Sequence, residues 1–112
     1  MKRTPFAQQW IDKLKTDPQE SFTQFSFIDG YTRDCKACAL GKAAQIHPDF
    51  TSSYTALPPH NDVPKLLGFD KANDPYNLVF HQIIFTPVTR MNDELSKTGV
   101  EIAEFLETVF NE

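Results

Sequence analysis

Two cysteines and two histidines are the residues of this sequence best suited to metal or redox chemistry. Cys35 and Cys38 form a Cys-x-x-Cys pair, and His47 and His60 follow further along the chain. Zinc takes four donors of this kind, and a Cys-x-x-Cys pair supplies two of them. The two histidines are farther apart than the usual second pair of a zinc site. One hypothesis is a zinc-stabilised module whose metal ligands are Cys35, Cys38, His47 and His60.

The same cysteine pair supports two other interpretations. A thiol at a helix N-terminus has a lowered pKa, which favours the reactive thiolate, so the pair is also a candidate redox dithiol. The βαβ context typical of such proteins is absent from the sequence. Alternatively, Cys35 and Cys38 are small core residues, since free cysteine is among the most buried residue types. We favour the core interpretation on that tendency, and the other two stay open.

Acidic residues concentrate towards the end of the sequence. The chain has a net charge of −4, and residues 93–112 hold six acidic side chains against one basic side chain. Three of these acids recur at helical spacing and are expected on the solvent face of a final helix. Solvation alone is the commoner reason for such a face. As a binding hypothesis, Glu101, Glu104 and Glu107 form a surface for a basic protein partner.

Cap residues and apolar periodicity predict the first and last helices. Thr4 and Pro5 form a cap followed by a proline, which starts a helix that stops before Asp17-Pro18. Its apolar stripe consists of Phe6, Ala7, Trp10, Ile11 and Leu14. Thr98 and Glu101 form a capping box for a helix that runs to about Phe110. The inward face of this last helix comprises Ile102, Phe105, Leu106 and Val109, flanked by Ala103 and Phe110.

The middle of the chain has weaker signals. Asp34 is expected to cap a helix that carries both cysteines and ends near Ile46 because of Pro48. Before it, alternation around Asp29-Gly30 predicts a hairpin with strands at about residues 23–28 and 31–33. Four aromatic residues of this region either reach the core or form an exposed surface for a partner, and we favour the core: Phe22, Phe25, Phe27 and Tyr31.

The second half of the chain is predicted to contain a loop and two further short elements. Residues 48–61 are expected to form a loop, and a short helix capped by Asn61 or Asp62 follows, through Val63, Leu66, Leu67 and Phe69. Residues 75–84 are predicted as a helix, although the apolar run 78–85 also suits a buried strand. Pro87 is expected to break this element. A turn is predicted at Met91-Asn92-Asp93.

Together these elements predict the fold class and exclude several kinds of protein. A chain of 112 residues, 40% hydrophobic and with 10 phenylalanines, is expected to form one domain, residues 1–112. We predict a mostly α fold, a compact bundle of four to five helices with one short β-hairpin. The sequence has no signal-peptide pattern and no apolar run of ~18 residues, so we expect a cytoplasmic protein that is not in a membrane.

Two stretches of the chain resemble an uncharacterised family of small bacterial and phage proteins. In the first, from Phe25 to Ala44, an Asp-Gly turn precedes Cys-Ala-Leu-Gly-Lys-Ala-Ala. In the second, from Met91 to Leu106, an Asn-Asp turn leads into a capped helix. The family is similar in placing a Cys-Ala-Leu-Gly helix after an aromatic-rich hairpin. The resemblance implies a compact, mostly helical domain, but no activity and no functional residues.

The function expected from the sequence is a non-catalytic interaction or regulatory module. The motifs of phosphate-binding loops, serine hydrolases and zinc proteases are absent, so nothing in the sequence indicates an enzyme. We expect a protein partner, no cofactor unless zinc is bound, and no direct contact with nucleic acid, because no basic patch is evident. A homodimer is a further hypothesis. The resemblance to phage proteins suggests a host-interaction or anti-defence role by analogy.

Overall fold

The computed structural model describes residues 1–25, 28–30, 33–48 and 63–112. Within these ranges the chain is mostly helical and has one two-stranded antiparallel hairpin, as predicted. The strands are β1 (Ile28–Asp29) and β2 (Lys36–Ala37). The helical elements are α1 (Pro5–Thr16), η1 (Gln19–Ser21), α2 (Ala39–Gln45), residues 63–66, α4 (Leu78–Phe80), the π-helical segment η2 (His81–Phe85), α5 (Thr86–Asp93) and α6 (Gly99–Val109).

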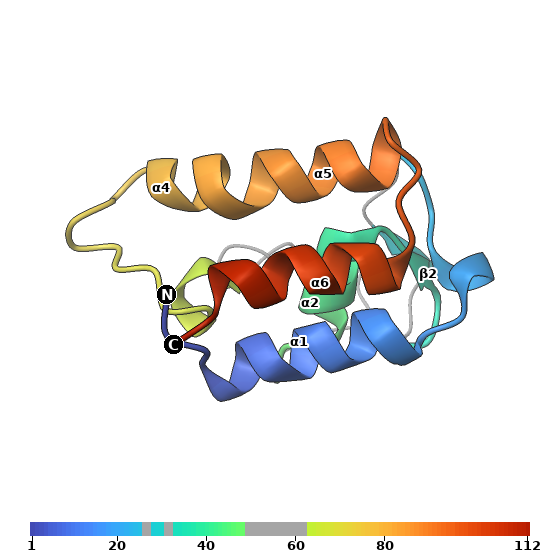
Figure 1. The fold of residues 1–112 in the computed structure, drawn as a ribbon, viewed down its shortest axis with the longest axis horizontal. Coiled ribbons are helices and arrows are strands. Elements are labelled where there is room, and N and C mark those ends of the chain that lie inside the picture. Colours follow the sequence, from blue (N-terminus) through green and yellow to red (C-terminus); the bar gives the residue numbers. More distant parts are fainter. Residues whose placement is uncertain (26–27, 31–32, 49–62) are drawn as a thin grey trace.

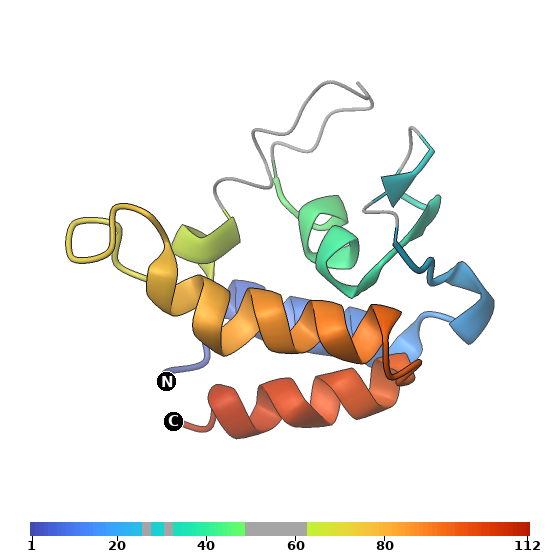
Figure 2. The same cartoon turned by 90° about the horizontal axis from the view of Figure 1, so that it is seen from above.

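The helices surround one hydrophobic core. In Figure 1, α6 lies between α1 and the continuous run α4–η2–α5, and α2 lies behind them. Figure 2 shows the hairpin and α2 on one side of the molecule and α6 on the other. The two ends of the chain meet, because the ammonium of Met1 donates to the carbonyl of Val109 at 2.7 Å. Among the described helices, none has the length and apolar character needed to cross a membrane.

The prediction for α1 is confirmed in its start, its buried stripe and its end. The hydroxyl of Thr4 accepts a hydrogen bond from the amide of Ala7 at 3.1 Å, and Pro5 takes the first helical position. All five residues of the predicted stripe are buried. The indole of Trp10 also donates to the carbonyl of Ala39 at 2.9 Å, which joins α1 to the first residue of α2.

The prediction for α6 is confirmed at its start and for most of its inward face. The capping box is present: the Thr98 hydroxyl accepts from the Glu101 amide, and the Glu101 carboxylate accepts from the Thr98 amide. The fully buried hydrophobic residues are Ile102, Ala103, Leu106 and Phe110. Phe105 and Val109, by contrast, pack against the core but remain half-buried.

Pro87 does not end the helix that precedes it, which corrects the prediction. Residues 78–85 are helical, not strand, and the helix continues through α5 to Asp93, so the predicted turn at Met91-Asn92-Asp93 is also wrong. A proline inside a regular helix lacks an N–H and clashes with the carbonyl four residues earlier. The wider π-helical turn of η2 comes directly before α5, and Pro87 then occupies the first turn of α5, where its missing N–H is tolerated.

The hairpin exists, but its strands differ from those predicted. Ile28 pairs with Ala37 and Asp29 with Lys36, so the second strand lies later in the chain than residues 31–33. Phe25 interrupts the expected first strand, since its φ is +62° and its side chain is 80% exposed instead of buried. Phe22 is half-buried against the core as expected. The predictions for Phe27 and Tyr31 lie outside the described residues.

The central helix is shorter than predicted. It begins at Ala39, and its N-cap is Cys38 and not Asp34, because β2 takes up the residues between the two cysteines. Its end at Ile46, before Pro48, agrees with the prediction. The predicted loop at residues 48–61, except for Pro48 itself, lies outside the described residues, as does the cap at Asn61 or Asp62. Beyond it, residues 63–66 are helical.

Candidate functional site

The two cysteines lie at opposite ends of α2. The sulfur of Cys38 accepts a hydrogen bond from the amide of Gly41 in the first turn, at 3.4 Å. The sulfur of Cys35 accepts one from the side-chain amide of Gln45, the last residue of the helix, also at 3.4 Å. Neither cysteine forms a disulfide, and both are partly buried. This arrangement differs from that of a redox dithiol, in which one helical turn holds both cysteines.

The environment of Cys38 favours its neutral thiol. Burial raises the pKa of Cys38, and the helix amides of Gly41 and Leu40 only partly offset that effect. A thiolate is the form that binds metal or attacks a disulfide. Cys38 therefore fits the interpretation as a packed, helix-capping residue better than the interpretation as a reactive group.

The candidate zinc ligands are only partly visible. His47 is buried and its ring packs edge-on against Phe6, with 6.4 Å between the ring centroids. His60 lies outside the described residues. Within the described part of the chain, no group of three or more histidine, cysteine, aspartate or glutamate side chains is arranged to hold a metal ion. The zinc hypothesis for Cys35, Cys38, His47 and His60 therefore stays a prediction.

Two of the three acids of the predicted binding surface have contacts within the chain. Glu107 pairs with Lys15 of α1 at 2.8 Å. Glu101 belongs to the capping box, and hydrogen bonds from Thr98 lower its pKa. Glu104 is exposed, and the structure describes no ion pair for it among the residues it covers. These contacts give Glu101 and Glu107 structural roles, and the acidic surface stays a prediction.

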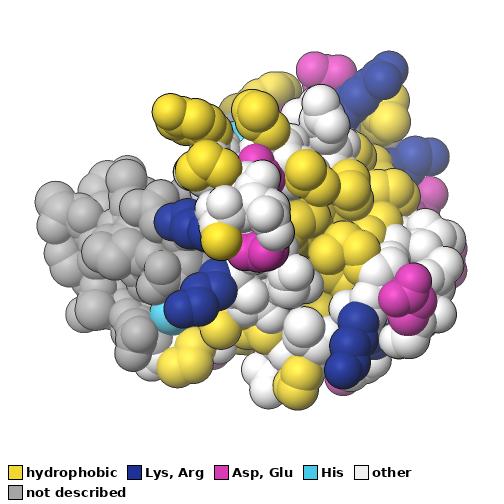
Figure 3. Space-filling model, turned by 90° about the vertical axis from the view of Figure 1, so that its left-hand side faces the viewer, with side chains coloured by type: hydrophobic (Ala, Val, Ile, Leu, Met, Phe, Trp, Pro, Cys, Tyr) yellow, Lys and Arg dark blue, Asp and Glu magenta, His cyan; other side chains and the backbone are white. Residues whose placement is uncertain are grey.

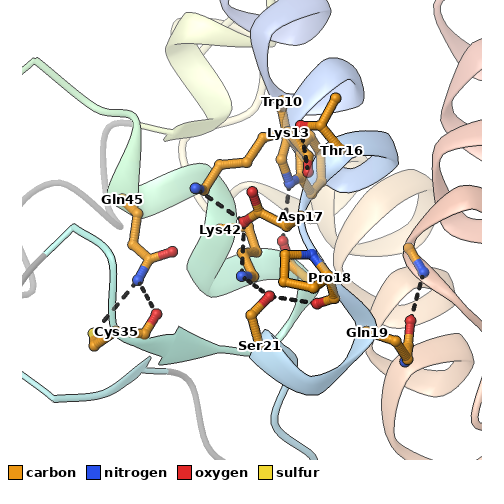
Figure 4. A network of polar contacts seen from close by, with 12 residues as sticks. Trp10, Lys13, Thr16, Asp17, Pro18, Gln19, Ser21, Cys35, Lys42 and Gln45 are labelled. Carbon is orange, nitrogen blue, oxygen red and sulfur yellow. Dashed lines mark hydrogen bonds and ion pairs between the residues drawn. The ribbon is translucent and has the colours of Figure 1, made fainter.

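A buried lysine forms the centre of a polar network between α1, η1 and α2 (Figure 4). Lys42 is 1% exposed, and its ammonium donates to the Asp17 carboxylate at 2.8 Å and to the Ser21 hydroxyl at 2.7 Å. It also lies 4.7 Å from the centroid of the Phe22 ring, where a cation is stabilised by the aromatic face. Periodicity places Lys42 on a packed helix face but does not indicate its partners.

The contact between Ser21 and Lys42 does not make a catalytic dyad. Such a dyad needs a neutral lysine that accepts the serine proton. Lys42 instead forms an ion pair with Asp17 at 2.8 Å, and Asp17 also pairs with Lys13 at 3.0 Å. The Ser21 hydroxyl donates to the carbonyl of Pro18 at 2.6 Å. The described contacts of this network therefore join the end of α1 to η1 and α2.

Asn92 joins three segments that are far apart in the sequence. Its side-chain oxygen accepts from the amide of Ala39 at 3.1 Å, and its side-chain nitrogen donates to the carbonyl of Thr23 at 2.8 Å. The neighbouring carboxylate of Asp93 accepts from the amide of Phe25 at 3.0 Å. The Asn-Asp pair thus holds residues 23–25 against α2 and α5. The sequence pattern predicts a turn at this pair and does not indicate its contacts with Ala39, Thr23 and Phe25.

A polar pocket opens beside this junction. Its volume is about 230 Å³. One aromatic and six polar residues line it: Gln19, Phe22, Thr23, Gln24, Asn92, Ser96 and Lys97. Ser96 has a φ of +50°, a left-handed conformation that is uncommon for residues other than glycine. We call these residues the polar pocket.

An apolar surface is left uncovered at the end of the molecule that carries α4 and both termini (Figure 3). Tyr76, Leu78 and Val79 are 80%, 61% and 45% exposed. Figure 3 shows hydrophobic side chains gathered on this side. We define the apolar face as six residues of this region: Tyr76, Leu78, Val79, Ile83, Phe105 and Val109. The last three of these are half-buried. The periodicity of residues 76–83 indicates a helix but not which apolar residues stay exposed.

Comparisons with known proteins do not assign a family. No family model matches the chain, and no curated protein and no solved structure matches it.

Proposed function

We propose that this chain is a small non-catalytic interaction module that binds a protein partner through the apolar face. The observation that carries the proposal is the exposure of Tyr76, Leu78 and Val79 within one short stretch of the chain. Burying apolar surface contributes roughly 25 cal/mol for each Å² removed from water. Exposed apolar side chains that gather on one side of a molecule, as in Figure 3, commonly mark a contact surface.

The arrangement of the apolar face supports an amphipathic helix as the contacting segment. Val79 and Ile83 are four residues apart on one helical run, and Phe105 and Val109 are four apart on α6. Residues at this spacing form a ridge on one side of a helix. Figures 1 and 2 place α4 and the C-terminal end of α6 at the same end of the molecule. Two apolar ridges at one end of the molecule suit recognition of the apolar side of an amphipathic helix.

The contacts of the side chains that could take part in catalysis support a non-catalytic role. The charge of Lys42 is engaged by Asp17, and Cys38 caps a helix as a neutral thiol. A regulatory role, including the host-interaction role suggested by the resemblance to phage proteins, belongs to the same proposal. The predicted basic partner for Glu101, Glu104 and Glu107 is an additional hypothesis, because Glu104 alone lacks a described ion pair.

The test is retention of a partner by matched variants. The full chain is tagged, partners are captured from the source organism, and any complex is checked for fixed stoichiometry by size-exclusion chromatography with light scattering. The variant Leu78→Ser/Val79→Ser removes the exposed apolar groups. The control variant Val100→Ser changes a similarly exposed apolar residue at the start of α6.

We expect wild type and the control to retain the same stoichiometric partner, and the double variant to lose it while keeping the wild-type free energy of unfolding. A partner that the double variant also retains would refute this use of the apolar face. Light scattering of the purified chain shows whether the partner is a second copy of the chain.

A further inference from the structure

We propose that the polar pocket binds a small oxyanion, a carboxylate or a phosphate, independently of the protein partner. The pocket holds about 230 Å³. A water molecule has a share of about 30 Å³ in the liquid, so the space suits several waters or one small ligand of similar size. The pocket is formed by two separate segments, residues 19–24 and residues 92–97.

Gln19 presents hydrogen-bond donors to this space. Its side-chain oxygen accepts from the amide of Gly99 at 3.3 Å, as Figure 4 shows for Gln19. Because a backbone amide can only donate, the oxygen must face Gly99, and the NH₂ group is turned away from it. No acceptor for that NH₂ group is described among the residues the structure covers. Gln19 therefore offers two donors to a ligand.

Ser96 and Lys97 add a hydroxyl and a positive charge. The Ser96 hydroxyl accepts from the side-chain nitrogen of Gln24 at 3.0 Å, which leaves its own proton to donate. Lys97 pairs with Glu101 at 3.5 Å, and both side chains are more than two-fifths exposed. An exposed pair of this kind is worth little, so the ammonium can turn to a ligand at small cost.

The balance of donors and acceptors selects the ligand class. Gln24 donates to the carbonyl of Asn92 at 3.2 Å, so its side-chain oxygen is the one free acceptor among the groups just described. Three groups can donate to a ligand: the NH₂ of Gln19, the hydroxyl of Ser96 and the ammonium of Lys97. A site in which donors outnumber acceptors, one of them an ammonium, favours an acceptor-rich anion, and hydrogen bonds to charged acceptors are the stronger ones.

The experiment is a titration of the ¹⁵N-labelled full chain, followed by two-dimensional NMR. Sodium phosphate and sodium glycolate are the two probes, each added against sodium chloride at equal ionic strength. The signals followed are the side-chain amides of Gln19 and Gln24 and the backbone amides of Ser96 and Lys97. The variants are Lys97→Gln and, as the control, Lys71→Gln, which changes an exposed lysine in the segment before α4 that does not line the pocket.

We expect saturable shifts at these signals with at least one probe, and the probe that saturates identifies carboxylate or phosphate as the source. Lys97→Gln should weaken binding about tenfold, and Lys71→Gln should leave it unchanged. Shifts that match those in sodium chloride would overturn the proposal. Equal binding by the Lys97→Gln variant would overturn it as well. Neither outcome bears on the apolar face.

Discussion

At the scale of single residues, the buried ion pair between Lys42 and Asp17 has an asymmetric effect on stability. Replacing a buried charge by an apolar side chain of similar size is often neutral, whereas removing only its partner leaves an uncompensated charge. Lys42 is almost fully buried, and Asp17 is its carboxylate partner. Removing Asp17 is therefore expected to lower the free energy of unfolding much more than replacing Lys42 by an apolar side chain.

We predict that Asp17→Ala lowers the free energy of unfolding by about 2 to 4 kcal/mol, while Lys42→Met changes it by less than about 1 kcal/mol. In the second variant Asp17 keeps its contact with Lys13. Urea denaturation followed by circular dichroism measures both values. Equal losses in the two variants would contradict this account of the pair.

The same pair predicts a pH dependence of stability. Burial raises the pKa of Asp17, but hydrogen bonds from Lys42 and Lys13 lower it by more, so its pKa in the fold lies below the ordinary value. A group with a lowered folded-state pKa contributes stability above its unfolded pKa of about 3.9 and loses it as the pH falls through the folded value.

The difference in unfolding free energy between wild type and Asp17→Ala should therefore be constant above about pH 5 and shrink as the pH falls below about 4. Urea denaturation at a series of pH values measures it. If this difference grew on acidification, the pKa of Asp17 in the fold would lie above its ordinary value, and the prediction would be contradicted.

Asn92 is the other residue whose removal should be costly. Its side chain satisfies the first amide of α2 and a carbonyl in the segment before β1. A buried donor left without an acceptor costs about 1–3 kcal/mol. We predict a loss of about 2–3 kcal/mol for Asn92→Ala and none for the exposed Asn111→Ala, measured by thermal and urea denaturation. A loss below about 0.5 kcal/mol for Asn92→Ala would show that the junction is not structural.

At the scale of elements, the capping box explains why α6 begins where it does. Thr98 satisfies an amide of the first turn, and such caps contribute about 1 kcal/mol. We predict that Thr98→Ala lowers the free energy of unfolding by about 1 kcal/mol. Thr108→Ala, an exposed threonine in the same helix, should have an effect of less than about 0.5 kcal/mol. Indistinguishable variants would contradict the role of the cap.

The sequence predicts a helix start correctly where the capping residues are adjacent to that start in the chain. Thr4 with Pro5, and Thr98 with Glu101, each lie within one turn of the helix they start, so α1 and α6 follow from the sequence. The start of α2 is different. Its first amide is satisfied by Asn92, which is distant in the sequence, and β2 withdraws the residues after Asp34 from the helix. No local pattern contains either fact.

The predictions of a helix end at Pro87 and of a strand at Phe25 are wrong for a similar reason. A proline predicts the end of a regular helix, but η2 changes the hydrogen-bonding pattern just before it. Phe25 alternates like a strand residue, yet its amide is bound by Asp93 and its backbone is left-handed. For the candidate site, residue type alone favours cysteines in the core, but both are only partly buried, and Cys38 packs against the core while capping α2. The apolar face and the polar pocket depend on which elements pack together, so periodicity does not reveal them.

At the scale of the whole molecule, contacts between the two ends of the chain hold α1 and α6 together, while the apolar residues of α4 stay exposed. The ammonium of Met1 contacts the carbonyl of Val109, and Arg3 donates to the carbonyl of Phe110 at 2.8 Å, so α1 and α6 are joined at their ends. The run α4–η2–α5 is fixed to α2 through Asn92 at its other end. The apolar residues at the start of this run are therefore held by the fold while they remain exposed.

The measurement that tests the central claim most directly is site-specific photo-crosslinking in the source organism. A photoreactive phenylalanine analogue replaces Tyr76 in the apolar face, and in a second chain it replaces Val100 as the control. We predict one defined crosslinked protein from position 76 and none from position 100, and the Leu78→Ser/Val79→Ser change should abolish the product. No product from position 76, or the same product from both positions, would contradict the account.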